Sequence, residues 1–370
     1  MKITDPVTDN SQLFHTLLAE HAIALEDHPF LWTTPPPLPT DFSFDRIEGM
    51  LLGLAIGDSL GNTTESQPPL TRNQRHGQID DYLPNQHAGY RKVGVPSDDT
   101  QMSFWTLEVL LEDGGLDPDH LAQRFCQEQI FGIGSSVREF ISKYKASKNW
   151  RTAGPNSAGN GALMRIAPVV VPHLKHPSCG LWADAALAGM VTHNDQSSNA
   201  ACVAFTAMLW DLLSMQQPPD PSWWMERYCQ VAEALEGQNT IYSPRMPNLV
   251  HHGPLWQFVQ QELPKAMEED WSTLEAGNTW GSGAFLLETV PSTLYILMRY
   301  GHDPEQALVR AVNDTWDNDT VAAIVGAAVG ALHGKDALPD RWVKNLLGRT
   351  NDHDNGHVFE LITHTNQRFW

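Results

Sequence analysis

The chain has 370 residues, of which 41% are apolar and 18% are charged, and this is enough apolar material for one large domain or two ordinary ones. Its 44 acidic residues outnumber its 24 basic ones and give a net charge of −20. Because such a chain repels phosphate groups, its charge argues against binding to nucleic acid or to an anionic membrane.

The sequence gives no sign of a secreted or membrane protein. The four cysteines have no CxxC spacing and are typical of reduced core thiols. The N-terminus lacks the basic and then apolar pattern of a signal peptide. The longest apolar stretch, 321–332, has 12 residues and is too short to span a membrane. We therefore expect a cytoplasmic protein.

The first expected unit is an N-terminal arm over residues 1–44. Ser11 is expected to cap a short helix, because an apolar stripe with helical spacing follows between Leu13 and Ala22. A Pro-rich run over 35–39 then predicts an extended linker, since proline lacks a backbone N–H and disfavours helix before it. A free arm and a strap packed on its own domain are both open at this point.

The second expected unit is a domain over residues 45–370, in which helical patterns dominate. Few runs alternate as strands do, and the one short β-branched run, 169–171, lies between two prolines. The sequence therefore predicts an all-α fold. The expected helices are 46–60, 100–112, 119–131, 180–190, 196–214, 222–235, 256–268, 290–299, 304–312 and 320–333.

Two of these helices carry small residues on one face. Glycine costs helix propensity, so its repetition at one spacing indicates close backbone packing rather than chance. The first seam comprises Gly49, Gly53 and Gly57, and the second comprises Gly326, Ala327, Gly330 and Ala331.

The first acidic motif, Ser97-Asp98-Asp99-Thr100, directly precedes a helical pattern. A single Asp or Ser is sufficient to cap a helix start, where negative charge is also favourable. Two adjacent carboxylates beside a hydroxyl also provide the close oxygen ligands that a hard divalent cation prefers. A cap and a metal site both fit this motif taken alone.

A second acidic motif, over 314–320, holds more oxygen-bearing side chains than a cap needs and again precedes a helical pattern. If the two helix starts converge, they form an oxygen-only cage suited to Mg²⁺, Mn²⁺ or Ca²⁺ rather than to zinc. Mutual repulsion of the carboxylates favours two cations over one, and two independent caps are the alternative. The cage would contain Ser97, Asp98, Asp99, Asp317, Asp319 and Thr320.

Two glycine-rich loops lie elsewhere in the chain. In the first, Gly159 and Gly161 flank Asn160 and precede a short apolar run, and the second, over 280–285, is similar. Flexible backbone N–H groups at a helix start can cradle a diphosphate, although a tight turn also fits the pattern.

Five motifs in this order resemble the ADP-ribosylglycohydrolase family, which includes the dinitrogenase-reductase-activating glycohydrolase. They are Gly53–Gly61 with Glu65, Ser97–Met102, Gly159–Arg165, Thr192–His193 and Asp317–Thr320, and the resemblance covers roughly residues 44–335. It implies a compact orthogonal bundle of helices with a binuclear Mg²⁺ or Mn²⁺ centre that releases ADP-ribose from a modified side chain.

The resemblance also implies residue roles. The metal ligands would be the six oxygen donors of the cage. Two cations would bind the ribose hydroxyls and lower the pKa of a water, and a catalytic carboxylate, Glu65 or Asp99, would orient or deprotonate that water. Substrate contacts are implied for Glu65, Gly159, Asn160, Gly161, Met164, His193, Gly281, Ser282, Gly283 and Phe285.

Two positions depart from the family pattern. Trp316 occupies a turn where the family usually has glycine, and we expect it to narrow the pocket or contact the substrate. Asn318 replaces a usual threonine, and its side chain is expected to point away from the alternating ligands.

An acidic pocket suits a cationic guanidinium, so we expect ADP-ribosyl-arginine on a modified protein as the substrate, with ADP-ribosyl-serine still open. A binding protein that has lost catalysis is the alternative from another class. The intact carboxylates of both motifs and of Glu65 favour the enzyme.

Immunity proteins similar to this family pair with ADP-ribosyltransferase toxins and carry an N-terminal extension that blocks the toxin's active site. In the arm here, Phe30, Leu31 and Trp32 would suit such an interface, and its acidic residues would suit a basic cleft. We therefore expect residues 1–44 to be dispensable for hydrolysis and to bind a cognate toxin.

Overall fold

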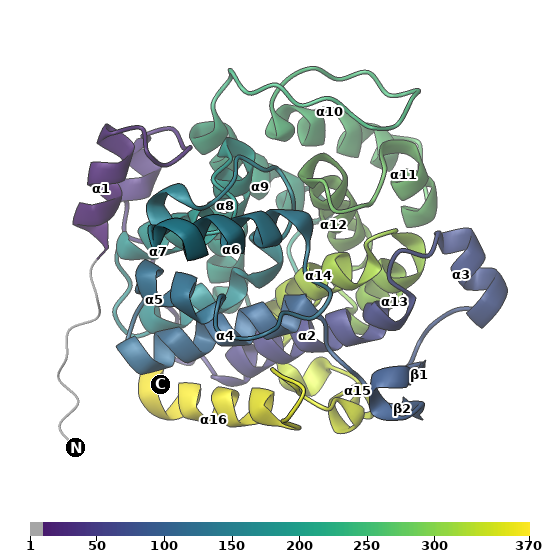
Figure 1. Ribbon diagram of the computed structural model, residues 1–370. Helices are drawn as coiled ribbons and strands as arrows, with labels where there is room; N and C mark the ends of the chain where they lie inside the picture. Colours follow the sequence, from purple (N-terminus) through teal and green to yellow (C-terminus); the bar gives the residue numbers. More distant parts are fainter. Residues whose placement is uncertain (1–9) are drawn as a thin grey trace.

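The computed structural model describes residues 10–370, and residues 1–9 of the predicted arm lie outside this range. Helices dominate the described chain, and the only sheet within it is a two-stranded antiparallel hairpin of β1 (Pro84–Asn85) and β2 (Arg91–Lys92). The predicted all-α fold is confirmed (Figure 1). Among the described residues, no helix is both long enough and apolar enough to cross a membrane.

The α-helices of the described chain are joined by connections of very different lengths, the longest of which spans residues 148–179. Their bounds are α1 Ser11–Ala19, α2 Asp45–Gly61, α3 Pro69–His76, α4 Asp98–Asp113, α5 Pro118–Arg124, α6 Ser135–Ser147, α7 Gly180–Met190, α8 Gln196–Ser214, α9 Pro221–Glu236, α10 Leu255–Glu268, α11 Thr273–Trp280, α12 Leu286–Tyr300, α13 Pro304–Asp314, α14 Asn318–His333, α15 Asp340–Asn345 and α16 His357–Phe369.

Each predicted helix coincides with an observed one, with two local corrections. The prediction over 119–131 is too long, because α5 ends at Arg124, and the N–H groups of Cys126 and Gln127 bond to carbonyls only three residues back. The cap position of α1 is occupied by Asn10 rather than Ser11. The proline-bounded run near 170 forms a 3₁₀ turn over Ala167–His173. Helices α3, α6, α11, α15 and α16 have no counterpart in the prediction.

The two predicted small-residue seams pack against each other, which confirms the close approach. A methyl group added at Gly53 would lie 2.1 Å from the carbonyl oxygen of Gly326, and one added at Gly49 would lie 2.5 Å from that of Gly330. The pairs run in opposite directions along α2 and α14, so these helices are antiparallel. The C-terminal end of α2 therefore lies beside the start of α14, where the second acidic motif stands.

The described part of the arm is a strap packed on its own domain. The side chains of Phe14, Leu17 and Leu31 are at most 1% exposed. The indole N–H groups of Trp182 in α7 and Trp210 in α8 donate to backbone carbonyls of the strap, at 2.7 and 2.8 Å. Of the two arrangements that the sequence left open, the structure has the strap.

Candidate active site

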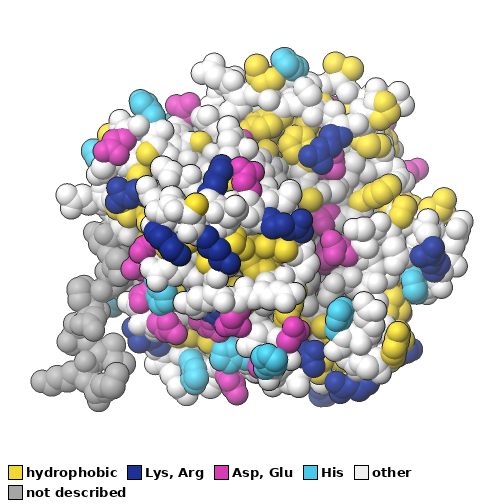
Figure 2. Space-filling model, viewed as in Figure 1, with side chains coloured by type: hydrophobic (Ala, Val, Ile, Leu, Met, Phe, Trp, Pro, Cys, Tyr) yellow, Lys and Arg dark blue, Asp and Glu magenta, His cyan; other side chains and the backbone are white. Residues whose placement is uncertain are grey.

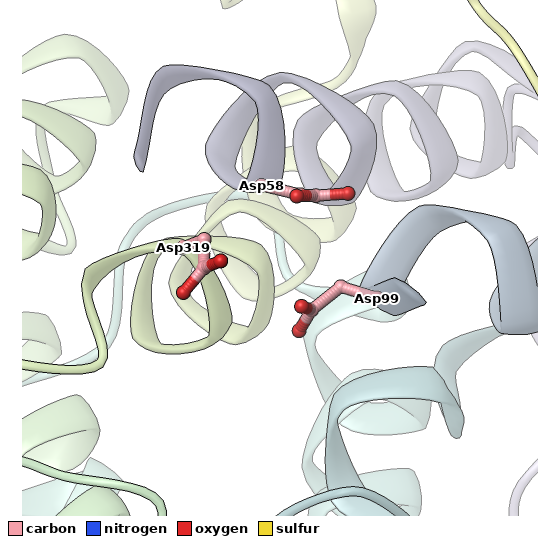
Figure 3. Close-up of side chains that lie close together, drawn as sticks. All are labelled: Asp58, Asp99 and Asp319. Atoms are coloured by element: carbon pink, nitrogen blue, oxygen red, sulfur yellow. The ribbon is translucent and has the colours of Figure 1, made fainter. Parts of the chain in front are cut away.

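Three chain segments bring carboxylates together at one point of the fold. Asp58 comes from the last turns of α2, Asp99 from the first turn of α4 and Asp319 from the first turn of α14 (Figure 3). Each of the three offers a carboxylate oxygen within 4.8 Å of the others, and Asp319 belongs to a second group of the same kind with Glu65 and Asp317. The two acidic motifs of the sequence thus meet at this cluster, and Asp319 is common to the two groups of carboxylates.

Asp58 organises the start of α4, and it is the member of the cluster that no predicted site included. Its carboxylate accepts hydrogen bonds from the backbone N–H of Ser97 at 2.9 Å and of Thr100 at 3.0 Å. The hydroxyls of the same two residues also donate to it. Its oxygens are thereby engaged, so Asp58 acts by positioning the first acidic motif. The available sequence signal was a single charged residue in the stretch 49–61, which is otherwise apolar apart from Ser59.

Asp99 has one hydrogen-bonded carboxylate oxygen and one that is available to a cation. The Thr320 hydroxyl donates to its Oδ2 at 3.3 Å, and the Ser97 hydroxyl lies 3.0 Å from the same atom. Its Oδ1 is buried and has no hydrogen-bond partner among the described residues. A buried carboxylate oxygen left without a donor is costly, and a bound cation would satisfy it.

The turn that carries Asp317 is held by a second glycine-rich segment. The backbone N–H of Asp317 donates to the Ser282 carbonyl at 2.9 Å, and the Ser282 hydroxyl accepts from the N–H of Trp316 at 3.0 Å. The N–H of Gly283 donates to Glu288 at 3.0 Å. Ser282 therefore supports this turn, and Gly281, Ser282 and Gly283 do not line the cavity.

Asn160 links the first glycine loop to the acidic cluster. Its side-chain amide donates to Asp317 Oδ2 at 2.6 Å, and its backbone N–H donates to the Ala284 carbonyl at 3.0 Å. An isolated antiparallel β-bridge between Gly159 and Phe285 connects the two glycine-rich loops. The first loop thus holds the Asp317 carboxylate, and the second loop holds the Asp317 backbone N–H.

His193 packs behind the first glycine loop as a neutral imidazole. Burial and the nearby Arg165 guanidinium lower its pKa to about 3. A methyl group added at Gly161 would lie 2.8 Å from the imidazole Cε1, so only glycine permits this close approach. Arg165 donates to the Thr192 hydroxyl at 2.7 Å, and that hydroxyl lies 2.9 Å from His193 Nδ1.

The cluster opens into a cavity of about 400 Å³. Of the predicted site residues, its lining includes Glu65, Asp98, Asp99, Gly159, Asn160, Gly161, Met164, His193, Phe285, Asp317, Asp319 and Thr320. The lining also contains residues that the sequence did not single out, namely Gly132, Gly134, Ser135, Ser136, Val137, Ser157, Ala158, Arg245 and Ala284. Arg245 lies over the Phe285 ring at 4.6 Å from the ring centre.

The two departures from the family pattern directly precede and follow Asp317 in the sequence. Trp316 is 46% exposed and does not line the cavity. It therefore does not narrow the cavity, contrary to the first of the two expectations for this residue. Asn318 is buried and points away from the carboxylates, as predicted. Its amide donates to the Gly61 carbonyl at 3.1 Å and so attaches the start of α14 to the end of α2.

The raised pKa values of the clustered carboxylates indicate that the cluster favours bound positive charge. Burial, and then repulsion by Asp58, raise the pKa of Asp98 to about 8. The same two causes raise the pKa of Asp99 well above its usual range, and for Asp319 burial acts together with repulsion by Asp99. Carboxylates packed this closely must bind either protons or cations. The donors are all oxygens, which suits hard divalent ions.

A model of the ADP-ribosylglycohydrolase family matches residues 39–367, and the chain belongs to this family. Family membership supports hydrolysis of an ADP-ribosyl conjugate that depends on a metal.

Individual proteins show the same relationship. The chain is 26% identical to the ADP-ribosyl-[dinitrogen reductase] glycohydrolase of Rhodospirillum rubrum, over 82% of this chain and 90% of that protein. It is 24% identical to the ADP-ribosylarginine hydrolase Tri1 of Pseudomonas putida, over 84% of this chain and 76% of Tri1. A solved structure titled ADP-ribosylglycohydrolase-related protein complex aligns with a TM-score of 0.66 and 26% identity, over 88% of this chain and 99% of that one.

Proposed function

We propose that the protein hydrolyses the N-glycosidic bond between ADP-ribose and a modified arginine side chain of a protein. The observation that carries this proposal is the cluster of five carboxylates, four of which line the cavity. An acidic pocket favours a cationic guanidinium as the group attached to ADP-ribose, and two of the similar proteins bear names for ADP-ribosyl-protein hydrolases.

The residues present fit two divalent cations, Mg²⁺ or Mn²⁺. Asp319 belongs to both carboxylate groups and would be shared, and Asp99 offers its unpartnered oxygen. When bound, the cations would bind the ribose hydroxyls and lower the pKa of a water. The full ligand set in this proposal is Ser97, Asp98, Asp99, Asp317, Asp319 and Thr320, with Asp58 holding Ser97 in place.

The chain's own residues would act on the attacking water and on the leaving group. Glu65 and Asp99 face the cavity and would orient the attacking water or accept its proton as the glycosidic carbon gains oxocarbenium character. Burial raises the pKa of Glu65, and repulsion by Asp317 and Asp58 raises it further. The leaving guanidine would take up the proton that Glu65 or Asp99 accepts from the water, and the acidic pocket would stabilise the resulting guanidinium.

The rest of the cavity wall would hold the ADP-ribose. Gly159 and Gly161 leave the backbone of their loop accessible to a diphosphate, and Asn160 and Met164 lie beside it. His193 would act as a neutral hydrogen-bonding group on the ribose side. Phe285 offers an aromatic face at the cavity wall. Ser282 would contribute by holding the Asp317 turn, and Gly281 and Gly283 flank Ser282.

An immunity role against a toxin stays a prediction that no contact among the described residues supports. The side chain of Leu31 is buried, and the ring of Phe30 packs on Trp182 at 5.0 Å between centres, so these anchors are used within the chain. The proposal is therefore limited to hydrolysis.

The experiment compares two conjugates. The purified protein is incubated with ADP-ribosyl-arginine and ADP-ribosyl-serine peptides of the same sequence in Mg²⁺, and free ADP-ribose is measured. We expect release from the arginine conjugate. Release only from the serine conjugate would reassign the substrate, and tight binding of ADP-ribose without release from either would indicate a binding protein.

A further inference from the structure

Basic side chains gather over α6, beside the cavity, although the chain as a whole is strongly acidic (Figure 2). Residues 138–151 hold five of the chain's 24 Lys and Arg but only one acidic residue, Glu139. The five define the basic α6 surface, and they are Arg138, Lys143, Lys145, Lys148 and Arg151. A concentration of this kind is unexpected in a chain with a net charge of −20.

The charge of this surface is directed outward and is mostly unneutralised. All five side chains are exposed, while Val137, Phe140 and Tyr144 anchor the opposite face of α6 in the core. Lys143 pairs with Glu139 at 2.7 Å. None of the other four forms an ion pair with a residue in the described range 10–370. Ion pairs within the described range therefore do not neutralise these four charges.

The N-terminal end of α6 lies at the cavity. The first residues of α6, Ser135 to Val137, line the cavity, and Arg138 follows directly. A helix of this length extends about 20 Å along its axis. A macromolecule with its modified residue in the cavity would therefore place its neighbouring residues along α6.

We propose that the basic α6 surface docks an acidic segment that flanks the modified arginine of the protein substrate. This inference rests on the proposed function and adds the partner's chemistry to it. The pocket carboxylates would select the guanidinium, and the surface outside would select Asp and Glu beside it. Such complementary charge speeds encounter and fixes the orientation of a partner.

An acidic protein segment fits better than a nucleic acid. A phosphate backbone is charged along its whole length, so beyond α6 it would run over the acidic remainder of this chain. A short run of carboxylates on a folded protein can end where the basic surface ends.

The test uses three substrates. Two mono-ADP-ribosyl-arginine peptides differ only in one flank, which is four Glu in one and four Gln in the other, and the third substrate is free ADP-ribosyl-arginine. We expect a kcat/KM ratio of about ten for the Glu over the Gln peptide at low salt, from the strength of a few exposed ion pairs. The difference should lie in KM and shrink with added salt.

Two double variants locate the effect. Lys145→Glu with Arg151→Glu reverses charge on the α6 surface, and should abolish or invert the preference while leaving kcat/KM for free ADP-ribosyl-arginine within about twofold. The matched control is Lys92→Glu with Lys344→Glu, which makes the same charge change at exposed lysines of β2 and α15. The control should keep the preference.

The possible outcomes distinguish failure of this inference from failure of the proposed function on which it rests. Hydrolysis of all three substrates without a preference for the Glu peptide, or a preference that survives the α6 variant, would overturn the inference alone. No hydrolysis of any substrate would remove the proposed function and the inference with it. Stronger inhibition by a short oligonucleotide than by polyglutamate would assign the surface to nucleic acid and also overturn the proposal.

Discussion

Asp58→Asn tests whether a residue without a free ligand atom organises the centre. The carboxylate accepts from four donors, two on Ser97 and two on Thr100. Asparagine keeps one acceptor oxygen and places an NH₂ group where the other was, so at least one buried donor loses its acceptor. That loss costs about 1–3 kcal/mol. Removal of a carboxylate whose pKa is raised by burial offsets part of it.

We expect the free energy of unfolding to fall by about 1–2 kcal/mol, measured by urea denaturation. Because the start of α4 loses its anchor, Mg²⁺ affinity measured by calorimetry, and turnover, should each fall by about 10–100-fold, the range for residues that orient metal ligands.

The matched control is Glu236→Gln. Glu236 is also a buried carboxylate with four donors, the hydroxyls of Ser197 and Thr240 and the backbone N–H groups of Leu255 and Trp256. It does not line the cavity. It should lose similar stability and keep Mg²⁺ affinity. Unchanged Mg²⁺ affinity and turnover in Asp58→Asn, with the same stability loss as the control, would refute the positioning role.

Three further predictions concern the fold and its charge. Gly53→Ala should destabilise the protein by about 1–3 kcal/mol despite better helix propensity, because the added methyl would lie 2.1 Å from a carbonyl oxygen of α14; an unchanged urea midpoint would contradict the seam. Without cations, the fold holds a proton on Asp98 up to about pH 8, against an ordinary pKa of 3.8. The folded state then binds more protons than the unfolded state, so the free energy of unfolding should fall as the pH rises from about 4 to about 8. Mg²⁺ should remove this fall, and a flat profile in a chelator would contradict the charge argument. Deletion of residues 1–38 should lower the Tm measured by calorimetry, because it exposes the apolar surface under the strap. An unchanged Tm with normal turnover would contradict the strap and indicate a free arm.

The seam and the acidic motifs were predictable from local chemistry. Glycine at 49, 53 and 57 has little value in a helix except to admit a neighbouring backbone, and a second helix with the same property was its natural partner. Runs of carboxylates at two helix starts exceed what capping needs. The family resemblance then indicated that these segments converge.

Other features depend on contacts that a single sequence does not display. Asp58 stands among apolar residues, and its role emerges only when the loop before α4 is placed against α2. The strap depends on Trp182, which lies 149 residues from its hydrogen-bond partner Thr33. Helix α6 has a narrow apolar face and many charges, which weakens the periodicity by which helices are predicted.

The most direct test of the account is cation-dependent release of ADP-ribose by the wild type and by two ligand variants, Asp99→Asn and Asp319→Asn. The wild type should release ADP-ribose from an ADP-ribosyl-arginine protein in Mg²⁺ and not in a chelator. Each variant should lose turnover and keep its fold, because it removes a ligand charge while relieving repulsion among buried carboxylates whose pKa values are raised. Near-normal turnover in either variant at saturating Mg²⁺, or equal release by the wild type in the chelator, would contradict a hydrolytic metal centre at this carboxylate cluster.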